Sequence, residues 1–386
     1  MNLNINRQVT KIQPSMIREM KILADRYEHV IDFTLGEPHV SHQTYETIQQ
    51  GLHQRMMKNP IGYSHQYGVL EVREAISNYC QSHYQQVYDP NHEIVITVGV
   101  SESISAVFKT ILEEGDEVIL FSPVFPLYKT NIEMYGGKVV FYDMTTNEMK
   151  VKSEVLKQLI TSKTKAILVN SPCNPTGKVF SKEENQIIYE CVKDHPIFII
   201  SDEIYREIVF DGVECPSLSE YSDLRNRLFI VNGVSKSFAM TGWRMGYILG
   251  PKDYIQTVAT VHQNFVASAS TISQYAVLEV FNHLELTENI KALYQRNRNY
   301  IYEALTPYFK QVVFPEGAFY LYLDASNYGL NSYDFAMTLL QKQQVATVPS
   351  LAFEESDSGY IRLSYCCDFE VLQDGVNRIQ NFIKSL

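Results

Sequence analysis

LFIVNGVSKSFAMTGWRMGYILG, residues 228–250, is the most informative stretch of this 386-residue sequence. Its two ends, residues 228–233 and 246–250, are short apolar runs that predict buried strands. Between them, Lys236 follows the first strand directly and lies among small residues. Lysine is seldom fully buried without a partner. Its position therefore points to a chemical role at the end of a strand.

Two interpretations of this segment stay open from the residues alone. Burial lowers the pKa of a lysine, and covalent attachment of a carbonyl cofactor requires such a lysine. Arg244, eight positions after Lys236, could bind a phosphate dianion through two N–H groups, with the Ser235 hydroxyl as a further donor. The alternative is a surface-loop lysine with a salt-bridging arginine, because short motifs also occur by chance.

The pattern around this segment predicts an α/β fold. Apolar runs with strand character alternate with amphipathic segments that have helix character, which predicts βαβ units and a mostly parallel, seven-stranded sheet flanked by helices. The predicted strands are residues 94–99, 118–122, 138–142, 166–170, 197–202, 228–233 and 246–250.

The pattern changes after about residue 280. A long helix over 286–305 leads into a strand-rich stretch, 311–324, followed by a helix, a strand over 359–365 and a last amphipathic helix. We expect a large domain of residues 41–280 and a smaller α+β domain built from residues 1–40 and 281–386. The N-terminal segment is expected to pack against the small domain or a partner subunit.

Polar residues follow several of the predicted strands, where ligands of parallel sheets bind. Asp202 ends the strand over 197–202, and a carboxylate there can keep a pyridine nitrogen protonated. Tyr205 could hydrogen-bond a phenolic oxygen on the same ring. A helix N-cap aspartate and an ordinary core tyrosine are the alternatives.

Three other segments lead to the same edge of the sheet. Asn174 lies in the loop NSPCNPTG, residues 170–177, although its Pro-Thr-Gly part forms turns in any protein. Gly99 precedes a predicted helix whose free N–H groups could bind a phosphate. Phe125 could stack on a planar ring, or be a plain core aromatic.

Composition argues against several classes of protein. The net charge is −11 and the basic residues are scattered, whereas nucleic-acid binding needs a basic stripe. We see no apolar run of membrane-spanning length and no signal-peptide pattern. The six cysteines form neither a disulfide framework nor a CxxC pair. We expect a reduced, cytoplasmic protein that binds neither nucleic acid nor membrane.

One spacing could indicate a metal site. His39 and His42 lie three residues apart, but no third ligand lies near them in the sequence. Catalytic zinc needs three protein ligands. We therefore expect no metal.

Taken together, these residues resemble the class I/II aminotransferases, pyridoxal-phosphate (PLP) enzymes of the aspartate-aminotransferase fold, which is fold type I. Eight motifs match in the family's order along almost the whole chain, and such a series is very specific. They are Leu35–Pro38, the pattern Tyr63, Gly68 and Arg73, then Gly99–Glu102, Gly115–Val118, Asn174–Gly177, Ser201–Tyr205, Ser235–Arg244 and Tyr360–Ser364.

The resemblance implies a role in cofactor binding for each matching residue. Lys236 would carry PLP, Asp202 would pair with its pyridine nitrogen, and Phe125 would stack on its ring. Asn174 and Tyr205 would contact its phenolic oxygen. The phosphate would be held by Ser235, Arg244 and the turn at Gly99, Val100 and Ser101.

The resemblance also implies how substrate and subunits meet. Arg362 would bind the substrate α-carboxylate beside Asn174, with the backbone around Gly36 closing over it. Tyr63 would reach the phosphate of a neighbouring subunit, so a homodimer with shared active sites is implied. The reaction would be a ping-pong amino transfer from an amino acid to a 2-oxo acid, with Lys236 as general base and acid.

Within the family, the chain is most similar to the bacterial N-acetyl-L,L-diaminopimelate aminotransferases, which implies 2-oxoglutarate as co-substrate. The stretches that carry this similarity are residues 235–246, 261–274 and 317–320. His39 and Ser101 depart from the pattern of aspartate-preferring relatives. The alternatives are an aspartate or aromatic aminotransferase, a PLP-dependent carbon–sulfur lyase and a non-catalytic PLP-binding module.

Overall fold

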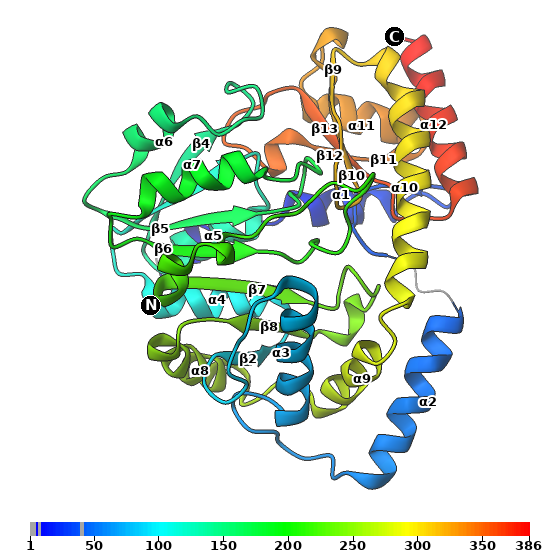
Figure 1. Ribbon diagram of the computed structural model, residues 1–386. Coiled ribbons are helices and arrows are strands. Elements are labelled where there is room, and N and C mark those ends of the chain that lie inside the picture. The colour runs from blue at the N-terminus through cyan, green and yellow to red at the C-terminus, as the bar shows by residue number, and fades with distance from the viewer. Residues whose placement is uncertain (1–4, 7–8, 39–41) are drawn as a thin grey trace, which may run out of the picture.

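The computed structural model describes residues 5–6, 9–38 and 42–386. A seven-stranded sheet forms its centre, in the order β2-β8-β7-β6-β5-β3-β4 (Figure 1). Strand β8 is antiparallel to both neighbours and the remaining pairs are parallel, as the sequence predicts. The strands are β2 (Ile94–Thr97), β3 (Glu117–Ser122), β4 (Lys138–Asp143), β5 (Thr164–Asn170), β6 (Phe198–Asp202), β7 (Leu228–Gly233) and β8 (Gly246–Leu249).

Helices cover both faces of this sheet, which explains why its strands are continuous apolar runs. Ile199 and Ile200 show the alternation, because they belong to hydrophobic clusters on opposite faces. One face carries α4 (Val100–Ile111), α5 (Pro126–Met134) and α8 (Lys252–Val266). The other carries α2 (His42–Lys58), α3 (Leu70–Tyr84), α6 (Ser153–Leu159), α7 (Lys182–Val192) and α9 (Thr271–Phe281).

A second, four-stranded antiparallel sheet lies in the C-terminal part, in the order β12-β13-β10-β9. Its strands are β9 (Gln311–Val313), β10 (Tyr320–Asp324), β12 (Val348–Pro349) and β13 (Tyr360–Ser364). Three helices accompany it, namely α10 (Leu286–Leu305), α11 (Ser332–Gln343) and α12 (Phe369–Lys384) (Figure 1). The architecture therefore changes after about residue 280, where the sequence pattern changes. The limits of the two domains stay a prediction.

The described part of the N-terminal segment packs on this C-terminal part. Strand β1 (Ile31–Asp32) pairs in parallel with β11 (Val345–Ala346). Helix α1 (Met16–Ala24) contacts β11 and β12 through buried side chains. These residues therefore pack against the C-terminal part of the same chain, while a contact with a partner subunit stays a prediction.

The remaining regular elements are short. The 3₁₀ turns are Val9–Lys11, Leu218–Glu220, Ser222–Arg227, Thr241–Trp243, Thr306–Tyr308, Ser326–Tyr328 and Ser350–Ala352. In the part of the chain that the structure describes, no helix has the length and apolar character needed to cross a membrane. All six cysteines are free thiols.

Glycines allow strand β8 to approach the turn before α4. A Cβ on Gly246 would lie 2.7 Å from the carbonyl carbon of Gly99 and 2.7 Å from the nitrogen of Val100. A Cβ on Gly233, which faces Gly246 across β7 and β8, would lie 2.7 Å from the Met245 carbonyl oxygen. Because these neighbours are backbone atoms, they cannot rotate away.

We therefore expect Gly246→Ala to lower the free energy of unfolding by about 1–3 kcal/mol, the usual cost of overpacking. Urea denaturation measures this. Gly62→Ala is the control, because nothing lies within 4 Å of its added Cβ, and it should change stability by less than about 0.5 kcal/mol. Equal stability of the two variants would contradict the close approach.

Candidate active site

A cavity of about 560 Å³ opens at the carboxyl ends of β5, β6 and β7. The structure thus brings to one place side chains that are far apart in the sequence. Most of the predicted site residues line this cavity. Those that do are Gly36, Val100, Ser101, Phe125, Asn174, Asp202, Tyr205, Ser235, Lys236, Arg244 and Arg362.

Lys236 lines this cavity and is half-buried. Its Nζ donates a hydrogen bond to the carbonyl oxygen of Gly36 at 2.7 Å. Burial lowers the pKa of Lys236 to about 8, and the nearby Arg362 and Arg244 act in the same direction. A substantial fraction of the amine is therefore neutral near physiological pH, which a nucleophile or general base requires.

Asp202 presents a buried carboxylate to the same cavity. The Tyr128 hydroxyl donates to its Oδ2 at 2.6 Å, and the Ile204 N–H donates to its Oδ1 at 3.1 Å. Burial raises the pKa of Asp202 to about 6, and the bond from Tyr128 opposes that rise. Within the described residues Asp202 forms no ion pair, so its charge is available to a cationic ligand group such as a protonated ring nitrogen.

Two tyrosines form a second polar pair in the cavity. The hydroxyl oxygens of Tyr205 and Tyr320 lie 2.8 Å apart. Burial raises the pKa of Tyr205 well above its usual value and that of Tyr320 to about 12. Both hydroxyls therefore keep their protons at neutral pH and can donate to a phenolate oxygen.

A turn and an arginine form the corner where a phosphate would bind. Gly99 has φ of 74° and immediately precedes α4, whose first residues, Val100 and Ser101, line the cavity. A Cβ on Gly99 would lie 2.7 Å from Nη2 of Arg244, so a larger residue would displace the guanidinium from this turn, and the positive φ itself favours glycine. Ser235 is buried nearby in the same lining. Helix-start N–H groups and a guanidinium are the donors that phosphates prefer.

A hydrogen-bonded contact between Glu102 and His262 supports this turn. Glu102, in the first turn of α4, accepts the N–H of Val98 at 3.1 Å and lies 3.0 Å from Nδ1 of His262. His262 is fully buried on α8. The contact ties the end of β2 to the start of α4, although the sequence alone singled out neither side chain for this role.

Arg362 crosses from the small sheet into the cavity. Its Nη1 donates to Oδ1 of Asn174 at 2.8 Å, and its Nη2 donates to the carbonyl of Thr34. Its guanidinium carbon lies 4.5 Å from the ring centroid of Tyr320. Within the described residues its Nε has no hydrogen-bond partner and the group pairs with no carboxylate. A buried arginine in that state can receive the carboxylate of a ligand.

The structure also adds residues that sequence reasoning missed. Tyr128 lies three positions after Phe125 on α5, a spacing that could have placed it on the same side. Tyr320 belongs to a segment noted only for its family similarity. Arg18 and Glu37 line the cavity from the N-terminal segment. Glu37 belongs to the motif Leu35–Pro38, which gives it no role, and no motif indicates Arg18.

The cavity lining leaves the roles of Tyr63 and of the two spaced histidines untested, and Gly99 adjoins the lining at Val100 without belonging to it. Tyr63 is 92% exposed and does not line it, so its role across a subunit boundary stays a prediction. His39 and the side chain of His42 lie outside the described residues, and the significance of their spacing stays open.

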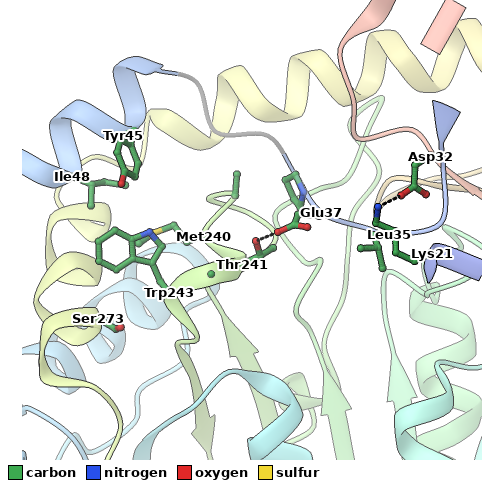
Figure 2. Close-up of a pocket in the computed structure, with 13 residues that line it drawn as sticks. Lys21, Asp32, Leu35, Glu37, Tyr45, Ile48, Met240, Thr241, Trp243 and Ser273 are labelled. Atoms are coloured by element: carbon green, nitrogen blue, oxygen red, sulfur yellow. Dashed lines mark hydrogen bonds and ion pairs between the residues drawn. The ribbon is translucent and has the colours of Figure 1, made fainter. Parts of the chain in front are cut away.

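A second cavity of about 780 Å³ adjoins the first and shares Leu35, Glu37, Thr241 and Gly242 with it. Figure 2 shows Trp243 in this second cavity, beside Tyr45 and Met240. Glu37 accepts a hydrogen bond from the Thr241 hydroxyl at 3.0 Å (Figure 2). Trp243 is the only tryptophan in the sequence, so its fluorescence can report binding next to it.

The residues present fit PLP. A buried amine of lowered pKa suits its carbonyl group, a carboxylate without a cation suits its ring nitrogen, and the corner at Gly99 and Arg244 suits its phosphate. The fit therefore rests on the kinds of donor and acceptor that the cavity brings together.

Comparison with known proteins extends over the whole chain. A family model described as aminotransferase class I and II matches residues 28–379. A probable N-acetyl-LL-diaminopimelate aminotransferase of Bacillus subtilis is 36% identical, covering 98% of this chain and 95% of that protein. An aromatic-amino-acid aminotransferase of Thermococcus litoralis is 31% identical, covering 98% of each. A Thermus thermophilus aspartate aminotransferase solved with maleate has a TM-score of 0.91 at 31% identity, covering 100% of both chains.

Removing the Tyr128 hydroxyl should change how cofactor binding depends on pH. The bond from Tyr128 lowers the pKa of Asp202, so Tyr128→Phe should raise that pKa above about 6. One hydrogen bond of about 1 kcal/mol corresponds to a shift of roughly 0.7 pH units. PLP affinity, which needs the ionised carboxylate, should then weaken at a higher pH than in the wild type.

Quenching of Trp243 fluorescence on titration with PLP measures that affinity. Tyr135→Phe is the matched control, because Tyr135 follows the same helix but contacts Ser105 at 2.6 Å, outside the cavity. If both variants gave the wild-type pH profile, the proposed effect of the Tyr128 hydroxyl on the pKa of Asp202 would be wrong.

Proposed function

Because the chain belongs to the class I and II aminotransferases, we propose that it transfers an amino group between N-acetyl-L,L-diaminopimelate and 2-oxoglutarate. As an aminotransferase it uses an amino-acid donor, a 2-oxo-acid acceptor and PLP. The observation that carries the catalytic proposal is the meeting of Lys236, Asp202 and Arg362 in one buried cavity. The substrate proposal rests on the similarity to the Bacillus subtilis protein over nearly the full length of both chains.

In this proposal each side chain has one task. PLP, when bound, supplies a ring that withdraws electrons from the substrate Cα. Asp202 holds the proton of the ring nitrogen, and Arg362 orients the substrate through its α-carboxylate. Phe125 would lie against one face of the ring, while Asn174 and Tyr205 would donate to its phenolic oxygen.

Lys236 is the proposed general base and acid. Its Nζ removes the proton from the substrate Cα and delivers it to the cofactor carbon on the other side of the transferred nitrogen. The lowered pKa of about 8 suits both directions, because the amine can be neutral or protonated near neutral pH. The hydrogen bond to the Gly36 carbonyl shows that the amine can reach the segment proposed to close over the substrate.

The sharpest test of the proposed function is a panel of amino donors with 2-oxoglutarate. We expect 2-oxoglutarate to be converted to glutamate fastest when N-acetyl-L,L-diaminopimelate is the amino donor, and more slowly when aspartate or phenylalanine is the donor. Preference for either of the last two would overturn the substrate proposal. Release of pyruvate from cystathionine without any 2-oxo acid would instead favour a lyase.

A lysine variant tests the catalytic proposal separately. Lys236→Ala should abolish turnover, with a loss of at least about 10³-fold, because the variant loses the group that moves the proton. Trp243 fluorescence should still show PLP binding, since the phosphate corner is intact. Lys21→Ala is the control, because Lys21 pairs with Asp25 and Asp32 outside the catalytic cavity. Unimpaired turnover by Lys236→Ala would refute the assignment.

We also propose a cytoplasmic homodimer with shared active sites. The support for shared sites is Tyr63, a family-motif tyrosine that is exposed outside its own cavity. The free state of all six cysteines agrees with a reducing compartment.

Mixing subunits tests the shared site. A heterodimer of Lys236→Ala and Tyr63→Phe subunits would hold one site with both changes and one with neither. We expect light scattering to give a dimer, and the mixed sample to regain a site with wild-type PLP affinity. Tyr63→Phe alone should bind PLP about 10-fold more weakly, the loss expected for one hydrogen bond to a charged group. A catalytically active monomer would contradict the proposal.

A further inference from the structure

One of the cationic side chains that line the active-site cavity has no role in the proposed function. Among the described residues that line it, the cationic ones are Arg18, Lys236, Arg244 and Arg362. The roles proposed above use the last three for the cofactor carbonyl, the phosphate and the α-carboxylate. Arg18 forms no ion pair or hydrogen bond with any described residue.

Packing of helix α1 holds Arg18 at the cavity. Ile17 and Met20 on this helix are buried, and Ile17 belongs to the same hydrophobic cluster as Phe353. The ring of Phe353 in turn lies 4.9 Å from the guanidinium carbon of Arg362. Helix α1 is thus fixed beside the residue proposed to bind the α-carboxylate. Arg18, one position after Ile17, is exposed on the cavity side.

The chemistry of the substrates calls for a second cation. In a ping-pong reaction both substrates occupy one site in turn. If the proposed function is right, both N-acetyl-L,L-diaminopimelate and 2-oxoglutarate carry a second carboxylate far from the reacting carbon. Carboxylates bind best to a guanidinium. The long, exposed side chain of an arginine can adjust to substrates of different length.

We propose that Arg18 binds the distal carboxylate of the substrates and so selects dicarboxylic over monocarboxylic 2-oxo acids. This inference rests on the proposed function and names the part of the site that sets its substrate class. The acidic groups that line the same cavity are Glu37 and Asp202, and neither forms an ion pair with Arg18 in the described structure; their side-chain hydrogen-bond donors are the hydroxyls of Thr241 and Tyr128.

The test uses the PLP-loaded enzyme and two acceptors of the same length. 2-Oxoglutarate has a distal carboxylate, whereas 2-oxopentanoate ends in a methyl group. We expect Arg18→Gln to lower the ratio of their kcat/KM values about 10- to 100-fold, the loss typical of a charge-assisted hydrogen bond. Arg18→Lys should restore part of that ratio. Arg26→Gln is the matched control, since Arg26 lies just beyond the same helix, exposed and outside the cavity lining, and it should leave the ratio unchanged.

A binding measurement separates recognition from turnover. Glutarate and pentanoate differ in the distal carboxylate but do not react, and Trp243 fluorescence can follow both. Arg18→Gln should weaken glutarate binding by about the same 10- to 100-fold factor relative to pentanoate. Unchanged ratios in both assays would overturn the inference while leaving the proposed function intact. A wild-type enzyme that used no dicarboxylic acceptor would overturn both.

Discussion

The site depends on the burial of unlike charges that do not neutralise one another. Asp202 and Arg362 are buried and Lys236 is half-buried, yet in the described structure none of the three forms a salt bridge with another side chain. Burying a charge in this way is costly unless hydrogen bonds compensate it. The compensation comes from neutral groups, namely the carbonyls of Gly36 and Thr34, the Asn174 amide and the Tyr128 hydroxyl. Each charge is therefore held in place and still available to a ligand.

This constraint explains why separate parts of the chain must meet. The loop after β5 supplies Asn174, the small sheet supplies Arg362, and the N-terminal segment supplies the carbonyl of Thr34. A second contact, between Tyr205 after β6 and Tyr320 on β10, joins the two sheets in the same region. The polar contacts that prepare the site are thus also contacts that hold the two sheets together. A substitution at Arg362 would consequently affect packing as well as the substrate binding proposed for it.

The sequence predicts those parts of the fold that depend on local patterning. The seven strands of the central sheet are continuous apolar runs, and the helix over 286–305 is strongly periodic, so both are found where expected. Asp202, Asn174 and Lys236 could be placed in one crevice because the carboxyl ends of parallel strands share an edge.

The rest depends on contacts between distant segments. Tyr128 reaches Asp202, 74 positions away, and Arg18 lines the cavity only because Ile17 is anchored on a remote sheet. No local pattern encodes such contacts. Tyr63 poses a different difficulty, since its proposed partner belongs to a second chain.

The antiparallel setting of β8 has a further consequence. Because β8 returns beside β7, Lys236 and Arg244 lie on one short connection, so the residues proposed for the carbonyl and for the phosphate of the cofactor belong to a single segment of the chain. An insertion there would displace both side chains at once, whereas Arg18 and Arg362 reach the same cavity from other segments and could be changed without altering this connection.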